Sequence, residues 1–141
     1  MFKISVWHGD LSDDYLRYVT QLGVDCLDFG SGNYFPGVEE QGYPALDELL
    51  KIKKRIRSWG LDINRVTLPD MTETFMLERD GAERELENTV NALKVFAEAK
   101  LPIARQRFHG DTFQHMLKRW NSPRRGGYSY RAESIALAEP N

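Results

Sequence analysis

The chain has 141 residues, with 41% hydrophobic and 28% charged side chains and a formal net charge of −2. This length and composition are typical of a single globular domain that buries a core. The one cysteine, Cys26, excludes an internal disulfide framework and favours a reducing compartment. No apolar run approaches the roughly 20 residues that span a membrane, and the N-terminus turns polar too soon for a signal peptide. We therefore expect a cytoplasmic protein with no membrane partner.

The basic side chains are concentrated toward the C-terminus. Residues 1–104 hold 12 basic and 18 acidic side chains, whereas residues 105–141 hold seven basic and three acidic ones. This surplus of positive charge is consistent with an anionic partner. A basic tail surrounded by solvent explains it equally well.

Predicted strands and helices alternate along the chain. Short apolar runs predict strands, and apolar residues at helical spacing predict helices. A strand over 2–7 comes first, and Ser12 is the predicted N-cap of a helix that Gly23 ends. The later elements, in order, are a strand over 24–29, a Gly- and Pro-rich loop over 30–44, a helix over 45–58, a strand over 61–69, a polar loop over 70–81, a helix over 82–99 and a strand over 103–109.

Each predicted helix has an apolar face that we expect to pack against the sheet. In the helix over 82–99, this face consists of Leu86, Val90, Leu93, Phe96 and Ala97.

Three helix–strand junctions repeat at a nearly constant interval. Gly23, Gly60 and Lys100 occupy equivalent places, 37 and 40 residues apart. Such alternation predicts a parallel sheet with right-handed crossovers. A doubly wound sheet and a (β/α)₈ barrel both satisfy the pattern, but no GxGxxG dinucleotide fingerprint follows the first strand. We therefore expect the α/β class and a parallel (β/α) half-barrel, with strands in the order 1-2-3-4 and helices on one face.

A complete barrel of this kind takes about 250 residues, and this chain supplies four strands. We expect it to be the N-terminal half of a larger barrel, with residues 1–141 forming one partial domain. After the fourth strand we expect a loop and tail over 112–141, with at most helical turns near 112–120 and 132–138 and no fifth strand.

Candidate binding residues cluster at the predicted carboxyl ends of the strands, where parallel α/β folds place their active sites. His8 and His109 could act as bases or metal ligands, although the spacing with Asp10 and Asp111 is a weak metal signal. Trp7 could stack on a sugar or simply pack. Together with residues of the later loop, the candidates for substrate binding are Trp7, His8, Asn64, Arg107, His109, Arg124 and Arg125.

The fourth predicted strand carries Arg105, Arg107 and His109 at alternate positions, so their side chains share one face. We expect that face to be the barrel lumen. Arg107 suits a carboxylate or phosphate, and Arg105, one layer deeper, requires an acidic neighbour. Asp28 is the first candidate for that neighbour and Asp62 the second.

The segment "SPRRGGYSYR" (122–131) interleaves arginine, glycine and tyrosine. This pattern occurs in segments that contact RNA, but one short stretch in an acidic protein makes nucleic acid an unlikely partner. A loop that closes over an anionic substrate explains the same residues.

Several stretches resemble the mannonate dehydratase family, whose members are xylose-isomerase-like TIM barrels. The most specific stretch contains Arg79, Glu85, Glu87 and Asn88 before "AEAKLPI". Thr67 stands where that family usually has a glutamate. The resembling stretches are "SVWHG", "GYPALDELLKIKKRIRSWGLDI", "MLERDGAERELENTVNALKVFAEAKLPI" and "RRGG".

The resemblance implies a lyase that dehydrates D-mannonate to 2-keto-3-deoxygluconate with Mn²⁺ or Mg²⁺, and hence a role in glucuronate catabolism. It also implies that the metal ligands come from later strands, so we expect no metal ligand in this chain and no turnover by it alone. A sugar isomerase or epimerase of the same superfamily is an alternative. A non-catalytic half-barrel that binds an anion, or pairs with another half, is a second. The open edges of half a barrel predict self-association.

Overall fold

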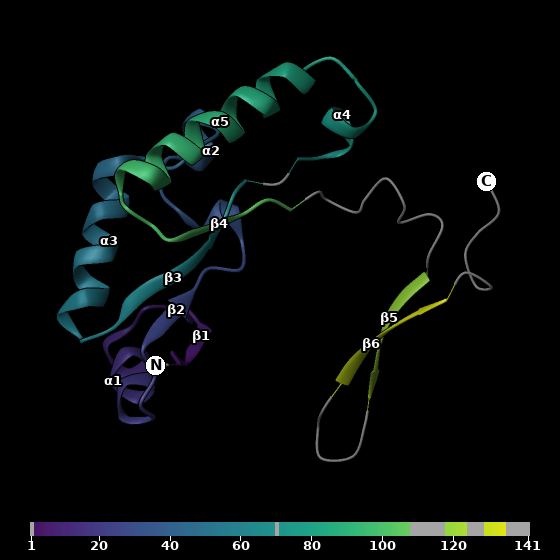
Figure 1. The fold of residues 1–141 in the computed structure, drawn as a ribbon. Coiled ribbons are helices and arrows are strands. Elements are labelled where there is room, and N and C mark those ends of the chain that lie inside the picture. Colours follow the sequence, from purple (N-terminus) through teal and green to yellow (C-terminus); the bar gives the residue numbers. More distant parts are fainter. Residues whose placement is uncertain (1, 70, 108–117, 124–128, 135–141) are drawn as a thin grey trace.

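The computed structural model describes residues 2–69, 71–107, 118–123 and 129–134, and in the last two ranges the backbone alone. Strands and helices alternate through the first 105 residues, as Figure 1 shows. The strands are β1 (Ser5–Trp7), β2 (Cys26–Asp28), β3 (Asp62–Thr67), β4 (Ile103–Arg105), β5 (Lys118–Pro123) and β6 (Ser129–Ser134). The helices are α1 (Asp13–Gln21), the 3₁₀ turn η1 (Gly32–Tyr34), α2 (Val38–Gln41), α3 (Leu46–Ser58), α4 (Glu73–Met76) and α5 (Ala82–Glu98).

The first four strands form one sheet in the order β1-β2-β3-β4, and every pair in it is parallel. The predicted class and strand order are therefore confirmed. The strands are shorter than predicted, most of all β4, which ends at Arg105 instead of residue 109. Residues 106 and 107 continue without strand pairing, and 108 and 109 lie outside the described residues.

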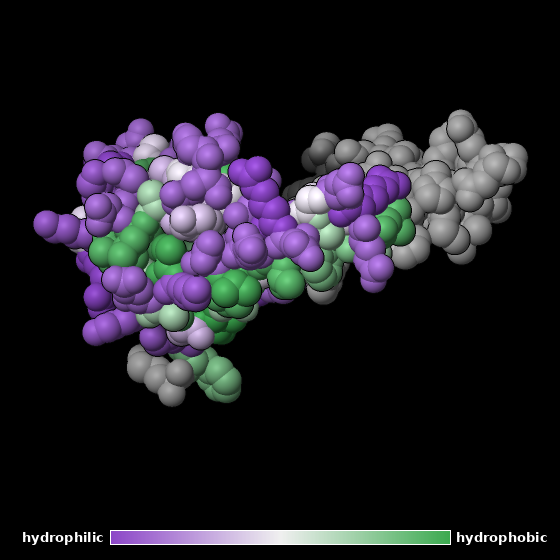
Figure 2. Space-filling view, turned by 90° about the horizontal axis from the view of Figure 1, so that it is seen from above, coloured by the Kyte–Doolittle hydropathy of each residue, from purple (hydrophilic) through white to green (hydrophobic). Residues whose placement is uncertain are grey.

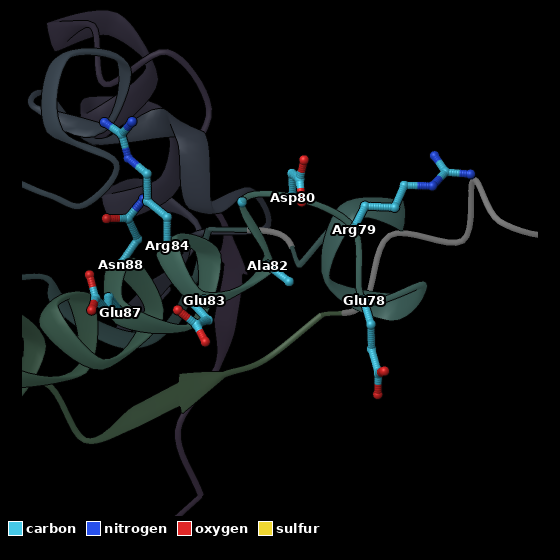
Figure 3. Close-up of a pocket in the computed structure, with 9 residues that line it drawn as sticks. Glu78, Arg79, Asp80, Ala82, Glu83, Arg84, Glu87 and Asn88 are labelled. Carbon is cyan, nitrogen blue, oxygen red and sulfur yellow. The ribbon is translucent and has the colours of Figure 1, made fainter.

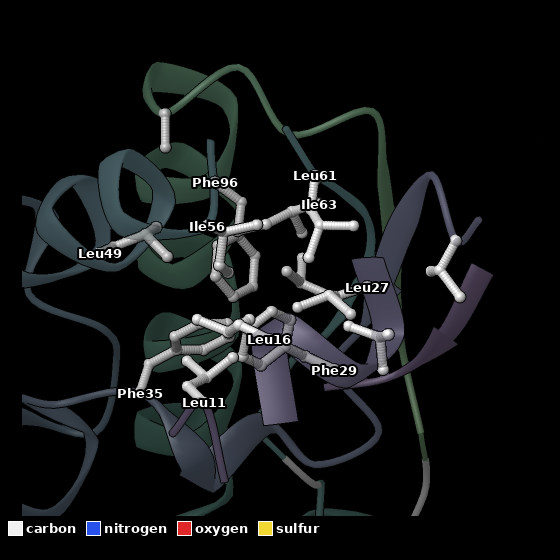
Figure 4. Packing of buried hydrophobic residues seen from close by; sticks show 14 of the residues in the cluster. Leu11, Leu16, Leu27, Phe29, Phe35, Leu49, Ile56, Leu61, Ile63 and Phe96 are labelled. Atoms are coloured by element: carbon white, nitrogen blue, oxygen red, sulfur yellow. The ribbon is translucent and has the colours of Figure 1, made fainter. Parts of the chain in front are cut away.

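The helices of the half-barrel pack on one face of the sheet. Leu27 and Ile63 are register partners on β2 and β3, and both belong to a buried apolar cluster. Leu16 of α1, Leu49 and Ile56 of α3, and Phe96 of α5 complete this cluster from the helix side (Figure 4). The opposite face of the sheet, which would line the lumen of a closed barrel and is named the concave face, carries the polar side chains of Ser5, Asp28 and Arg105. Trp7 and Cys26 alternate with residues of the core side and lie on this face too.

The repeated junctions share a backbone conformation. Gly23 and Gly60 have φ of 76° and 77°, and Lys100 has φ of 53°, so all three are left-handed. A left-handed residue ends each preceding helix and turns the chain into the next strand. Lysine has a Cβ that disfavours this region, yet the sequence equivalence of Lys100 with the two glycines is confirmed.

A bulge in β3 interrupts the regular alternation of its side chains. Leu27 pairs with Ile63, but the next residue, Asp28, pairs with Arg65, so Asn64 is the extra residue. Because of this extra residue, Asn64 and Arg65 both reach Asp28, while Val66 returns to the buried core.

Three predicted connections contain structure that the sequence analysis missed. The loop over 30–44 holds η1 and α2, and the loop over 70–81 holds α4. The expected tail over 112–141 contains β5 and β6, which pair in an antiparallel hairpin. The expectation of no further strand was therefore wrong, as were helical turns where they overlap these strands. The sequence contains a hairpin signal that was overlooked, namely a pair of turn-forming glycines between segments with aromatic residues: Gly126-Gly127, with Trp120 before it and Tyr128 and Tyr130 after it.

The buried face of α5 differs from the predicted one. Of the five residues expected to face the core, only Phe96 is buried, and Leu86, Val90 and Leu93 are more than two-fifths exposed. Thr89 and Ala92 are buried instead. Near the start of α5, Glu85 accepts hydrogen bonds from the amide and hydroxyl of Thr72, contacts that are compatible with this orientation of the helix.

Candidate ligand-binding site at the carboxyl ends of the strands

Asp28 is the centre of a polar cluster on the concave face. Its Oδ1 accepts hydrogen bonds from Ser5 Oγ at 2.7 Å and from Asn64 Nδ2 at 3.0 Å. Its Oδ2 lies 3.2 Å from Arg65 Nη2 in a half-buried ion pair. Three neighbouring strands thus contribute to this cluster, and the carboxylate charge is balanced within it.

A second cluster lies where β2, β3 and β4 end. Arg105 Nη2 donates hydrogen bonds to the carbonyl oxygen of Gly30 and to Oγ1 of Thr67, both at 3.2 Å. Thr67 is fully buried, and its hydroxyl donates to the carbonyl of Phe29 at 2.8 Å. Arg105 is therefore tied to the carboxyl ends of both preceding strands.

Close packing holds the loop after β2 against the loop after β3. A Cβ on Gly32 would lie 2.0 Å from the carbonyl oxygen of Leu68 and 2.3 Å from the nitrogen of Pro69. Only glycine permits this approach. The approach fixes the segment that presents the Gly30 carbonyl to Arg105.

The acidic neighbour expected for Arg105 is absent from its described contacts. Asp28, the first candidate, pairs with Arg65, and Asp62, the second, lies 3.6 Å from Arg57 at the amino end of β3. Among the described residues Arg105 forms no ion pair, and its Nε is buried without a hydrogen-bond partner. The expectation was wrong because the bulge brings Arg65 to Asp28.

Four of the seven candidate binding residues fall within the described part of the chain. Trp7 ends β1 and is 63% exposed, and Asn64 belongs to the Asp28 cluster. Arg107 is exposed just after β4, where its carbonyl accepts a hydrogen bond from the amide of Met71 at 3.3 Å. His109, Arg124 and Arg125 lie outside the described residues. Their binding roles stay predictions.

His8, the fourth of these residues, is only 4% exposed and packs with aromatic core residues. Its ring centroid lies 4.5 Å from that of Phe29 and 4.2 Å from that of Tyr34. Neither imidazole nitrogen has a hydrogen-bond partner among the described residues, and burial lowers the pKa of His8 below its ordinary value of 6.5. The imidazole therefore packs among aromatic rings, while the backbone amide of His8 donates to the carbonyl oxygen of Asp28 at 3.1 Å.

The described residues do not form a metal-binding group. No three His, Cys, Asp or Glu side chains among them gather closely enough to hold an ion. The carboxylate best placed on the concave face, Asp28, is instead occupied by three protein donors. Within the same part of the chain, no helix has both the length and the apolar character that a bilayer crossing requires.

The surface near α5 has a hollow of about 750 Å³, lined by residues 78–84, 87 and 88 (Figure 3). One continuous segment forms this hollow, so side chains from different elements do not converge there as they do around Asp28 and Arg105. Viewed from above, hydrophobic groups form separate patches among mainly hydrophilic ones (Figure 2). The carboxyl ends of β2, β3 and β4 are therefore the better candidate site.

Comparisons with known proteins add a likeness of fold. No family model and no curated protein matches this sequence. Among solved structures, the crystal structure of mannonate dehydratase from Streptococcus suis serotype 2 is similar, with a TM-score of 0.68 at 18% identity. The similarity covers 93% of this chain and 37% of that chain, so this chain spans little more than a third of that protein's length. At this identity, the comparison supports the parallel half-barrel fold.

Proposed function

We propose that this chain is the substrate-binding N-terminal half of a sugar-acid dehydratase barrel that resembles mannonate dehydratase. The likeness to the Streptococcus suis enzyme supports the class of barrel. The observation that carries the proposal is the pair of polar clusters on the concave face, which includes two guanidiniums and one carboxylate. The Arg105 cluster lies at the strand carboxyl ends, where parallel barrels bind substrates, and the Asp28 cluster includes the last residue of β2.

A sugar acid matches this face in both charge and polarity. Its carboxylate would be attracted by the surplus positive charge, and its hydroxyl groups would meet the amide and hydroxyl groups of Asn64 and Ser5. Trp7 offers an exposed ring beside them. Arg107, His109, Arg124 and Arg125 remain proposed contacts from the segments that follow β4.

The proposal assigns this chain the recognition of substrate and no part of the metal site. Mn²⁺ or Mg²⁺ is the cofactor that the family resemblance implies, but the described residues do not fit such an ion. We therefore derive no chemical step through a metal here, and turnover by this chain alone is not expected.

The test is a calorimetric titration of the 141-residue protein with D-mannonate, with its C2 epimer D-gluconate and with D-mannitol. D-Mannitol has the same chain of hydroxyl groups and no carboxylate. Tighter binding of D-mannonate than of both other compounds supports the proposal. Equal binding of D-mannonate and D-mannitol contradicts a sugar-acid site, and equal binding of the two epimers contradicts recognition of this substrate.

A further inference from the structure

We propose that Arg105, in place of the more exposed Arg107, binds the carboxylate of the ligand. This inference rests on the proposed function and identifies the charged group within the same site.

The two guanidiniums on the concave face, those of Arg65 and Arg105, have different surroundings. Arg65 has a carboxylate partner, Asp28, at 3.2 Å. Arg105 has only neutral acceptors among the described residues, namely the Gly30 carbonyl and the Thr67 hydroxyl. Hydrogen bonds to these acceptors position a guanidinium but bring no negative charge, so within the described part of the chain the charge of Arg105 has no counter-ion. An anionic ligand would supply the missing charge.

The position of Arg105 makes it a rigid anchor. It is the last residue of β4 and the register partner of Thr67, the last residue of β3. Both described hydrogen bonds come from one terminal nitrogen, Nη2, so these bonds fix the orientation of the planar guanidinium. With Nη2 held in this way, the other terminal nitrogen, Nη1, is preorganised to donate to a carboxylate.

The neighbouring contacts also explain why Arg105 does not form an ion pair with Asp28. The carboxylate of Asp28 already accepts from Ser5 and Asn64 as well as from Arg65. The Thr67 hydroxyl is itself oriented by its hydrogen bond to the Phe29 carbonyl. These contacts keep the two charged clusters apart and leave Arg105 for an external anion.

The experiment measures affinities of D-mannonate, acetate and D-mannitol for the wild-type chain, Arg105→Gln, Arg105→Lys and the control Arg57→Gln. Arg57 pairs with Asp62 at the opposite end of β3, so its replacement removes the same charge far from the site. Circular dichroism establishes that each variant is folded. Arg105→Lys retains the charge and serves as the second variant if Arg105→Gln fails to fold.

We expect Arg105→Gln to weaken D-mannonate binding by at least about tenfold, as for a lost charged hydrogen bond. Binding of D-mannitol should change little, Arg105→Lys should lose less, and Arg57→Gln should match wild type. If wild type prefers D-mannonate and folded Arg105 variants keep that preference in full, Arg105 is structural and the inference is overturned.

The same data separate this inference from the proposed function. If the wild-type chain binds acetate as tightly as D-mannonate, and Arg105→Gln weakens both, then Arg105 binds carboxylates but the sugar-acid proposal fails. If no anion binds the wild-type chain, both are overturned.

Discussion

Replacing Gly32 by alanine tests the packing that holds the candidate site together. The new Cβ would lie 2.0 Å from the carbonyl oxygen and 2.2 Å from the carbonyl carbon of Leu68. These are backbone atoms, so no side-chain rotation relieves the overlap, and the loops after β2 and β3 must separate. Overpacking of this kind costs typically about 1–3 kcal/mol and occasionally more. We therefore expect Gly32→Ala to lower the free energy of unfolding by about 1–3 kcal/mol or more.

Urea unfolding followed by circular dichroism gives the comparison, and each kcal/mol corresponds to about 3–4 °C in melting temperature for a chain of this size. Gly30→Ala is the matched control two residues away, because a Cβ there meets nothing within 4 Å. The control should retain wild-type stability. If Gly32→Ala is as stable as Gly30→Ala, the two loops do not pack as described.

Three further predictions concern stability and association. Lys100→Gly should stabilise the protein by about 0.5–1 kcal/mol in urea unfolding. A left-handed non-glycine residue costs about 1–2 kcal/mol, but the greater conformational entropy of glycine in the unfolded chain offsets part of the gain. A loss of stability would contradict the strain assigned to Lys100. Because His8 has a lowered pKa in the folded state, its stabilising contribution is present above pH 6.5 and declines as the pH falls toward the folded-state pKa. The urea midpoint of unfolding should therefore fall with pH in this range, and His8→Phe should make that pH dependence weaker. The edge strands β1 and β4 carry exposed Trp7 and Ile103. Light scattering should therefore show self-association of the chain, and Ile103→Lys should weaken that self-association. A monodisperse 16.3 kDa wild-type monomer at high concentration would refute this prediction.

The fold was predictable where local signals repeat. The Gly23, Gly60 and Lys100 junctions mark the ends of successive helices, and their common left-handed conformation explains why the spacing predicted a parallel sheet. The orientation of α5 was less predictable. Its apolar pattern offers two overlapping faces, and the buried one is compatible with contacts distant in sequence, such as that of Glu85 with Thr72.

The candidate site was only partly predictable for a similar reason. Alternation placed Arg105 on the concave face, but a bulge at Asn64 cannot be located from strict alternation, and it decides that Asp28 pairs with Arg65. His8 shows the opposite error. A histidine after a strand resembles a catalytic group in sequence. Its burial depends on the ring of Tyr34, from a loop that local patterns do not place, packed with that of Phe29 at the end of the predicted strand over 24–29.

The most direct test of a sugar-acid site at the strand ends is a nuclear magnetic resonance titration of the ¹⁵N-labelled chain with D-mannonate, with D-mannitol as the reference. We expect the amide signals of Gly30, Thr67 and Arg105 and the side-chain amide signals of Asn64 to shift saturably, and more with D-mannonate than with D-mannitol. Shifts confined to residues 78–88, which line the hollow near α5, or equal responses to both compounds, would contradict a sugar-acid site at the strand ends.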